Sequence, residues 1–464
     1  MYTKFQDFIS TDNDPFANDK LGRASHITKL TQVISSIDNG CVMAINGEWG
    51  AGKTTFVKMW QSWLNQRGFS TAYYNAWETD YVLDPIIPIA GELYELFQLN
   101  SDREKANAFV TQLGYIIPKA VSKFINHKAA ELIGEECVDE LKNGTQILSN
   151  SMLSILDDYH SSKQSILDLR QCLTSLATNS DNPYIFFIDE LDRCKPSYAV
   201  SVLERIKHLF NVPNIVFILS IDKVQLANSV RGYYGSDKIA AEEYLKRFID
   251  FEYHLPCPND TDDFITYLFS RFGLKSLLSF KNKEYGDHFT TLVSAFFKHL
   301  SLTPRQAEQL FSHFQFTIRI IQNNTKYDWN SSFILLYIRL FYPAVFQKIA
   351  NREYSLQELV NVLEETFTVS FFEGSDKYDS TKYQTNFDIG VFIGTYFQTE
   401  WTFNTCFFWN SDEDKKNKKV KFTCSHINSN IISEAWTDPR FDGRYLCNFS
   451  KLIEAVEIGA SLSS

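Results

Sequence analysis

Three short apolar runs stand out along the chain, each of the length and character of a strand that is buried on both faces. They span residues 41–45, 184–188 and 215–221, and a glycine or an acidic residue follows each within two positions. Elsewhere apolar residues recur at helical spacing, as in 54–66 and through much of 257–350. Because buried parallel strands are joined by helices, the pattern predicts an α/β fold with a parallel sheet.

The first apolar run leads into a glycine-rich loop of Gly47, Glu48, Trp49, Gly50, Ala51, Gly52, Lys53 and Thr54, followed by Thr55. The loop matches G-x-x-x-x-G-K-[ST] between a strand and a helix that runs toward Gln66. Backbone N–H groups can surround phosphates only where side chains do not obstruct the turn, and the following helix points its positive end at the anion. We expect these residues to bind ATP, with Lys53 at the β- and γ-phosphates and the Thr54 hydroxyl on Mg²⁺. A glycine-rich turn that matches by chance is the alternative.

The second apolar run ends in an acidic pair, Asp189 and Glu190. Ligands of open α/β sheets bind at the carboxyl ends of the strands, which is where these acids lie. We expect Asp189 to hold Mg²⁺, directly or through water, and Glu190 to act as the general base on the attacking water. An N-cap of the next helix is the alternative for such a pair. A chain that only senses nucleotide has no need of Glu190, so its presence favours turnover.

The third run, 215–221, also ends in polar groups. Ser220 and Asp222 are the candidates to orient water or to sense the γ-phosphate. Two arginines lie near predicted helices further on: Arg247, on a helix that leads into a short strand, and Arg305, beside a predicted N-cap at Thr303. We predict that either arginine can stabilise charge on the γ-phosphate, with a plain surface charge as the alternative for each. If one acts across a subunit boundary, the active enzyme is an oligomer.

Six segments, in their order along the chain, resemble the signatures of the KAP family of P-loop NTPases, in its bacterial branch: NGEWGAGKTTF, YYNAWETD, FFIDELDRCKP, FILSIDKVQLANSV, EEYLKRFIDFEYHLP and TPRQAEQLF. The segment from Asp19 to Arg23 also resembles the lead-in of that family. The resemblance spans roughly residues 10 to 350. Trp49 and the Asp192-Arg193-Cys194 run distinguish it from AAA+ and STAND ATPases. Glu190 is a departure, because the family often has Asp there, and we interpret the change as conservative for hydrolysis.

The resemblance implies an ATPase of the additional-strand, conserved-glutamate type, with a RecA-like sheet and an α-helical lid. Members of the family include bacterial and plasmid proteins linked to phage exclusion and animal membrane-associated signalling proteins. Family membership therefore defines the nucleotide-driven machinery and leaves the output open.

The domain organisation follows from the spacing of the motifs. Lys53 and Asp189 are separated by far more than the roughly 50 to 80 residues that one or two βα units need, so we predict an insertion. The predicted parts are a first NTPase segment at 1–82, a helical insertion at 83–165, a second NTPase segment at 166–256, a helical lid at 257–350 and a C-terminal α+β region of unknown role at 351–464. The insertion can pack as a hairpin or lie on a membrane surface, but Pro118 and two lysines argue against a membrane span.

Composition narrows the class of protein. Because the formal net charge is −11, nucleic-acid binding would require a local basic patch. We interpret the five lysines between 415 and 421 as a solvated loop rather than as such a patch. The eight Cys form no C-x-x-C pair, which indicates a reducing compartment, and the first twenty residues lack the apolar stretch expected of a signal peptide. We therefore expect a cytoplasmic protein. No Cys/His group has metal-ligand spacing and no nucleophile–base pair stands out, which argues against a nuclease or protease site.

The function that these observations favour is Mg²⁺-dependent ATP hydrolysis that drives a conformational or oligomeric switch. By family analogy, we expect a homo-oligomer that serves in bacterial antiviral defence with a separately encoded effector protein. One alternative is a nucleotide-bound scaffold at a membrane face with little turnover. The other is a DNA-stimulated ATPase, which would gather its basic side chains into one groove.

Overall fold

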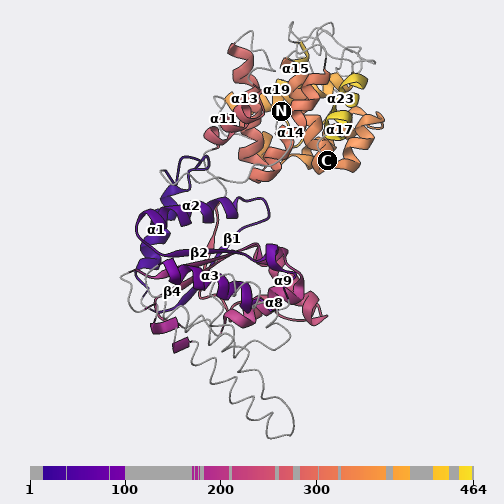
Figure 1. Ribbon diagram of the computed structural model, residues 1–464. Helices are drawn as coiled ribbons and strands as arrows, with labels where there is room; N and C mark the ends of the chain where they lie inside the picture. The colour runs from indigo at the N-terminus through magenta and orange to yellow at the C-terminus, as the bar shows by residue number, and fades with distance from the viewer. Residues whose placement is uncertain are drawn as a thin grey trace. The chain divides into compact units, whose positions relative to one another are not determined.

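A computed structural model describes most of the chain outside one long central stretch (Figure 1). The described residues are 14–37, 39–82, 84–99, 170–171, 173–175, 177, 182–207, 212–256, 261–274, 283–300, 302–321, 326–372, 380–397, 422–437 and 449–461. They form two compact units, the first ending at Pro256 and the second taking up the described residues from 261 onward.

The first unit is built on a parallel five-stranded sheet with the strand order β2-β3-β4-β1-β5. The strands are β1 (Cys41–Asn46), β2 (Thr71–Asn75), β3 (Tyr184–Asp189), β4 (Ile215–Ile221) and β5 (Phe251–His254). β4 lies between β1 and β3 and pairs with both. This is the additional strand that the sequence resemblance implies, and it confirms the RecA-like arrangement predicted for the sheet.

Helices cover both faces of this sheet, as Figure 1 shows. α1 (Ala24–Ser35) and α2 (Lys53–Gln66) pack on one face. The other face is covered by α3 (Ile86–Leu99), α8 (Pro196–Ile206), α9 (Lys223–Tyr234) and α10 (Ala241–Leu245). Two short 3₁₀ turns, η1 (Trp77–Thr79) and η2 (Leu191–Arg193), follow β2 and β3.

The buried strands explain the two-sided packing. Every residue of β3 and β4 is buried, and alternate side chains point to opposite faces. Phe187 packs toward α2, with its ring 5.8 Å from that of Trp60, while Phe186 packs toward the other face against Phe217. A continuous apolar run is therefore what a strand covered on both sides requires.

In the second unit, the regular elements among the described residues are all helices. Its helices are α11 (Asp262–Arg271), α13 (Lys283–His299), α14 (Pro304–Ile320), α15 (Lys326–Phe341), α16 (Pro343–Ala350), α17 (Leu356–Thr366), α18 (Val369–Phe372), α19 (Ser380–Tyr396), α22 (Ser429–Thr437) and α23 (Phe449–Ser461). Phe296 and Phe333 meet edge to face in its core, with ring centroids 5.1 Å apart. Thr303 caps α14 in a capping box with Gln306, as its sequence predicts.

Two local expectations differ from the structure. The helix predicted to include Arg247 ends at Leu245, because the backbone tightens there into i→i+3 turns, in which the N–H groups of Arg247 and Phe248 bond to Tyr244 and Leu245. Within 351–464, where we expected a mixed α+β region, the regular elements that the structure describes are helices.

Several predictions fall outside the described residues. Residues 100–165 of the predicted insertion and the whole lysine cluster at 415–421 belong there. The predicted domain boundaries stay predictions. Among the helices that the structure describes, none combines the length and the apolar character that a membrane span requires.

One buried hydrogen bond joins the two helices on the α2 face and offers a test of this packing. The Trp60 indole N–H donates to the Thr31 hydroxyl at 2.9 Å, and both side chains are buried. We predict that Thr31→Val lowers the free energy of unfolding of the first unit by about 1–3 kcal/mol, because the indole N–H loses its acceptor. Thr28→Val, on the same helix and half-buried, serves as the control, with a loss below about 1 kcal/mol. Urea denaturation would measure both, and equal losses would contradict the predicted role of the bond.

Candidate functional site

The phosphate loop leaves the sheet at the end of β1 and enters α2. The Gly47 N–H donates to the Ile221 carbonyl of β4 at 3.1 Å, which fixes the start of the loop against the neighbouring strand. Gly50 and Gly52 have φ of 86° and 83°, values in the left-handed region that favours glycine. The loop is therefore shaped by its glycines and held by the sheet.

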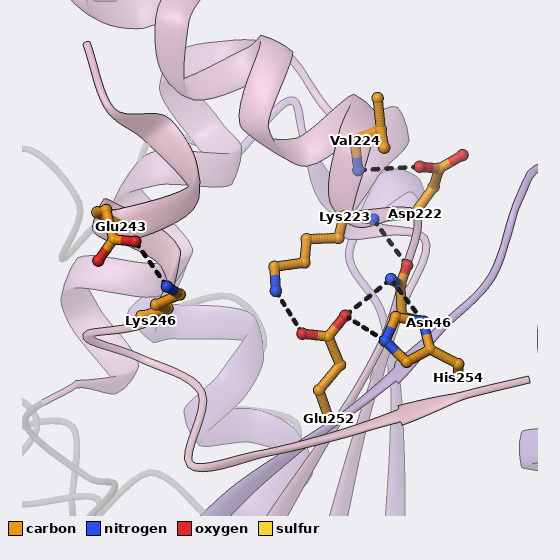
Figure 2. A network of polar contacts seen from close by, with 8 residues as sticks. All are labelled: Asn46, Asp222, Lys223, Val224, Glu243, Lys246, Glu252 and His254. Atoms are coloured by element: carbon orange, nitrogen blue, oxygen red, sulfur yellow. Dashed lines mark hydrogen bonds and ion pairs between the residues drawn. The ribbon is translucent and has the colours of Figure 1, made fainter.

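A polar network anchors the residue that precedes the loop (Figure 2). The Asn46 side chain accepts from the Lys223 backbone N–H at 3.0 Å and donates to Glu252 at 2.9 Å. Glu252 forms ion pairs with Lys223 and with His254 of β5. The network joins β1, β5 and α9 immediately before Gly47. It accounts for the fixed direction in which the chain enters the loop.

Lys53 lies within the loop and is only 8% exposed. Its ammonium group donates to the Gly47 carbonyl at 2.7 Å and to the Glu48 carbonyl at 3.2 Å. Burial lowers the pKa of Lys53, and nearby carboxylates, foremost Asp192, oppose this effect. The side chain is thus held across the loop, within electrostatic range of the acids that follow β3.

Asp189 ends β3 beside the phosphate loop. In the sheet register it pairs with Ser220 of β4, which in turn pairs with Ile45 of β1. Its carboxylate is 1% exposed and accepts from the Tyr73 hydroxyl at 2.9 Å and from the Glu190 backbone N–H at 2.9 Å. Two inter-strand spacings, about 10 Å in all, separate the backbones of β1 and β3 at this level.

Glu190 has a backbone conformation that is unusual for a residue with a side chain, with φ 59° in the left-handed region. Its carboxylate forms an ion pair with Arg193 at 2.8 Å. Burial raises the pKa of Glu190, the Arg193 guanidinium lowers it, and the neighbouring carboxylates raise it. Such a residue persists only where the surrounding structure holds it, and left-handed residues of this kind gather at functional sites.

Asp192 connects the acidic turn to the phosphate loop. It is 5% exposed, and its Oδ2 accepts a hydrogen bond from the indole N–H of Trp49, a loop residue. Its Oδ1 is buried without a hydrogen-bond partner among the described residues. Burial raises the pKa of Asp192, while Lys53 and Trp49 lower it. The contact shows that the loop and the acids converge, although a long stretch of sequence separates them.

The two predicted sensor residues differ in their surroundings. The Ser220 hydroxyl is fully buried, and within the described part of the chain it has no hydrogen-bond partner. The Asp222 side chain caps α9 by accepting from the backbone N–H groups of Val224 and Gln225 at 3.1 and 3.2 Å. Figure 2 shows that Asp222 lies next to the Asn46 network. Of these two predicted sensor residues, Ser220 is therefore the one whose side chain has no hydrogen-bond partner among the described residues, and it lies beside Asp189.

The donor set suits Mg²⁺ better than a metal held by protein side chains alone. Thr54 begins the first turn of α2, and Asp189 lies one strand beyond β4. In the described ranges, no group of three or more His, Cys, Asp or Glu side chains could hold a metal ion. Mg²⁺ usually takes one or two protein oxygens and completes its shell with water and phosphate. The Thr54 hydroxyl and the Asp189 carboxylate, beside a phosphate loop, match this coordination preference.

The two candidate arginines lie in different units. Arg247 is exposed between α10 and β5 of the first unit. Arg305 is exposed near the start of α14 in the second unit. Thr55, the last of the predicted phosphate-site residues, lies in the first turn of α2.

The structure adds residues that the sequence did not single out. Tyr73 bonds to Asp189, and Arg23 donates to two loop carbonyls. The sequence offered hints in the family marks Trp49 and Asp192, whose hydrogen bond now gives them a physical role. Tyr73 left no comparable signal, because it is one of two adjacent tyrosines in its strand.

The left-handed conformation of Glu190 can be tested through stability. We predict that Glu190→Gly is more stable than Glu190→Ala by about 1 kcal/mol, because glycine relieves the strain that a Cβ imposes at positive φ. Both variants remove the same carboxylate and its ion pair, so each is the control for the other. Urea denaturation of the two variants measures the difference. An alanine variant as stable as the glycine variant would contradict the backbone geometry.

Comparison with known proteins shows which protein family the chain belongs to. The KAP family P-loop domain matches residues 23–324, well over half of the sequence. None of the curated proteins matches. Two solved structures are similar over most of the chain: a DNA replication initiation factor (11% identity, 84% of this chain and 99% of that chain, TM-score 0.28) and the Aeropyrum pernix ORC2 protein in ADPNP–ADP complexes (14% identity, 95% of each chain, TM-score 0.31). Scores this low establish no shared overall fold. On the strength of the family match and the loop geometry, the chain belongs to the KAP family and is a P-loop NTPase, an enzyme that hydrolyses nucleoside triphosphates.

Proposed function

We propose that the chain hydrolyses ATP with Mg²⁺ at the site formed by the phosphate loop and the acids that follow β3. The observation that supports this most directly is the hydrogen bond between Trp49 of the loop and Asp192 of the acidic turn. It brings the two halves of the site into contact. Lys53, buried in electrostatic range of Asp192 and Asp189, is the fixed cation for the β- and γ-phosphates.

Glu190 is the general base in this proposal. It accepts a proton from the attacking water as that water approaches the γ-phosphate. Burial raises its pKa from the ordinary value of a glutamate, which makes the carboxylate a stronger proton acceptor than an exposed one. Ser220, buried with an unused hydroxyl in register with Asp189, is placed to orient the same water.

Thr54 and Asp189 are the residues that would hold Mg²⁺. When bound, the ion neutralises charge on the β- and γ-phosphate oxygens. Gly50, Ala51 and Gly52, with Gly47, Glu48, Trp49 and Thr55, complete the phosphate site. Their part is binding and orientation, which brings the γ-phosphate into line with the water on Glu190.

Beyond hydrolysis, we propose that the enzyme acts as an oligomer. Arg247 and Arg305 are both exposed, as a residue that reaches into a neighbouring subunit must be. One of them would supply positive charge to the γ-phosphate. The family resemblance supports a role in bacterial antiviral defence, with the switch between nucleotide states acting on a separate effector protein.

The role of Glu190 is tested by its amide variant. We expect Glu190→Gln to bind ATP with a Kd within about threefold of wild type while kcat falls by roughly 100-fold or more, because the amide cannot accept the proton. Phosphate release and calorimetric titration measure the two quantities. Glu204→Gln, at an exposed glutamate of α8, should leave both unchanged, and Lys53→Ala should lose binding. Turnover at the wild-type rate in Glu190→Gln would remove Glu190 from the mechanism.

The ion pair between Arg193 and Glu190 predicts a change in pH dependence. Glu190 works only as the carboxylate, so kcat falls as the pH drops through its pKa. Because Arg193 lowers that pKa, Arg193→Gln should raise it and move the acid limb of the kcat profile to higher pH. Arg205→Gln, which breaks an ion pair with Asp84 instead, is the control. An acid limb that stays in place in Arg193→Gln would contradict the assignment.

A further inference from the structure

An arginine far from the loop in sequence supports the loop from behind. Arg23 directly precedes α1 and is 4% exposed. Its Nη2 donates to the Ala51 carbonyl at 2.8 Å and its Nη1 to the Gly52 carbonyl at 3.3 Å. These are consecutive carbonyls at the point where the phosphate loop becomes α2.

Arg23 is itself held in place by Asp19. One oxygen of the Asp19 carboxylate accepts from the Arg23 backbone N–H at 2.9 Å, and the other accepts from the Ala24 N–H at 2.7 Å. The carboxylate thereby satisfies N–H groups at the start of α1, where backbone donors lack partners within the helix. The backbone of Arg23 is fixed, so its guanidinium reaches the loop from a defined position.

The direction of the two carbonyls determines where the loop points its donors. In a trans peptide the C=O and the following N–H point in opposite directions. Since the carbonyls of Ala51 and Gly52 face Arg23, the N–H groups of Gly52 and Lys53 face away from it. In a phosphate loop these backbone donors surround the α- and β-phosphates.

The packing at Gly52 agrees with this arrangement. Its φ of 83° is open to glycine, and a Cβ built there would lie 3.0 Å from Nη1 of Arg23. Glycine at this position therefore serves two needs, the turn of the loop and the close approach of the guanidinium. The contact is tight enough that the loop and Arg23 must have matching geometry.

We propose that Arg23 is a positioning residue for nucleotide binding: its guanidinium fixes two peptide planes so that the N–H groups of Gly52 and Lys53 face the phosphates. This inference rests on the proposed function, in which the loop holds the nucleotide. Arginine suits the task because its planar fork bonds two acceptors at once, whereas lysine offers a single point charge. The fork orients the loop, and the charge alone does not.

The test compares Arg23→Lys and Arg23→Ala with wild type by calorimetric titration of MgADP and MgATP. The lysine variant keeps the charge and loses the fork. We expect both variants to bind ADP and ATP more weakly by the same factor, about tenfold or more. The reason is that the misdirected N–H groups contact phosphates that both nucleotides share. Arg205→Ala, at a half-exposed arginine of α8, is the matched control and should bind as wild type.

Four outcomes would overturn the inference. The first is an Arg23→Lys variant with wild-type affinity, since charge alone would then suffice. The second is a loss confined to ATP. The third is wild-type binding in both variants while Lys53→Ala loses binding, which would leave the proposed function standing without Arg23. If Lys53→Ala itself binds normally, the proposed function fails and this inference fails with it. The lysine variant keeps the test open should the alanine variant not fold.

Discussion

The site depends on one constraint, the pairing of β4 with both β1 and β3 in a fixed parallel register. Ser220 pairs with Ile45 on one side and with Asp189 on the other, so the phosphate loop and the acids leave the same edge of the sheet about 10 Å apart. Side chains alternate along a strand, so a slip of one residue would turn Asp189 and Ser220 toward the α8 face. The apolar residues of β4, buried on both faces, oppose such a slip because it would exchange the side chains packed in two cores.

Around this register the protein gathers buried charged groups, and the ion pairs among them only partly offset the effect of burial. Burial raises the pKa of Glu190 and of Asp192 and lowers that of Lys53, so each group is less stable in its charged form than it would be in water. Lys53 bonds to carbonyls of its own loop, and Glu190 bonds to Arg193 from a left-handed backbone. Local geometry that costs stability and collects at one place is typical of a functional site.

The sequence predicted the parts of this structure whose signal is local. Continuous apolar runs placed β3 and β4 to within a residue, and the N-cap predicted at Thr303 marked the start of α14, because capping involves only neighbouring residues. Contacts between distant segments left no such trace. The bonds from Arg23 to the loop and from Trp49 to Asp192 depend on how strands and helices are placed in space, which periodicity does not encode. Asp222 shows that a local sequence signal can also be ambiguous. An acid after a strand can face a ligand or cap the next helix, and here the Asp222 carboxylate caps α9.

The long stretch between α3 and β3 leaves the site intact for a topological reason. It joins β2 and β3, which are already hydrogen-bonded neighbours, with Asn75 in register with Asp189. The entropic cost of closing a connection grows only with the logarithm of its length, so extra residues there weaken the β2–β3 pairing little. The register is fixed by the pairing and by the two cores. The connection therefore can lengthen without moving Asp189, whereas one added residue between β1 and α2 would change the loop itself. Insertions are tolerated on the β2–β3 side of this sheet for that reason, and the loop side has no such freedom.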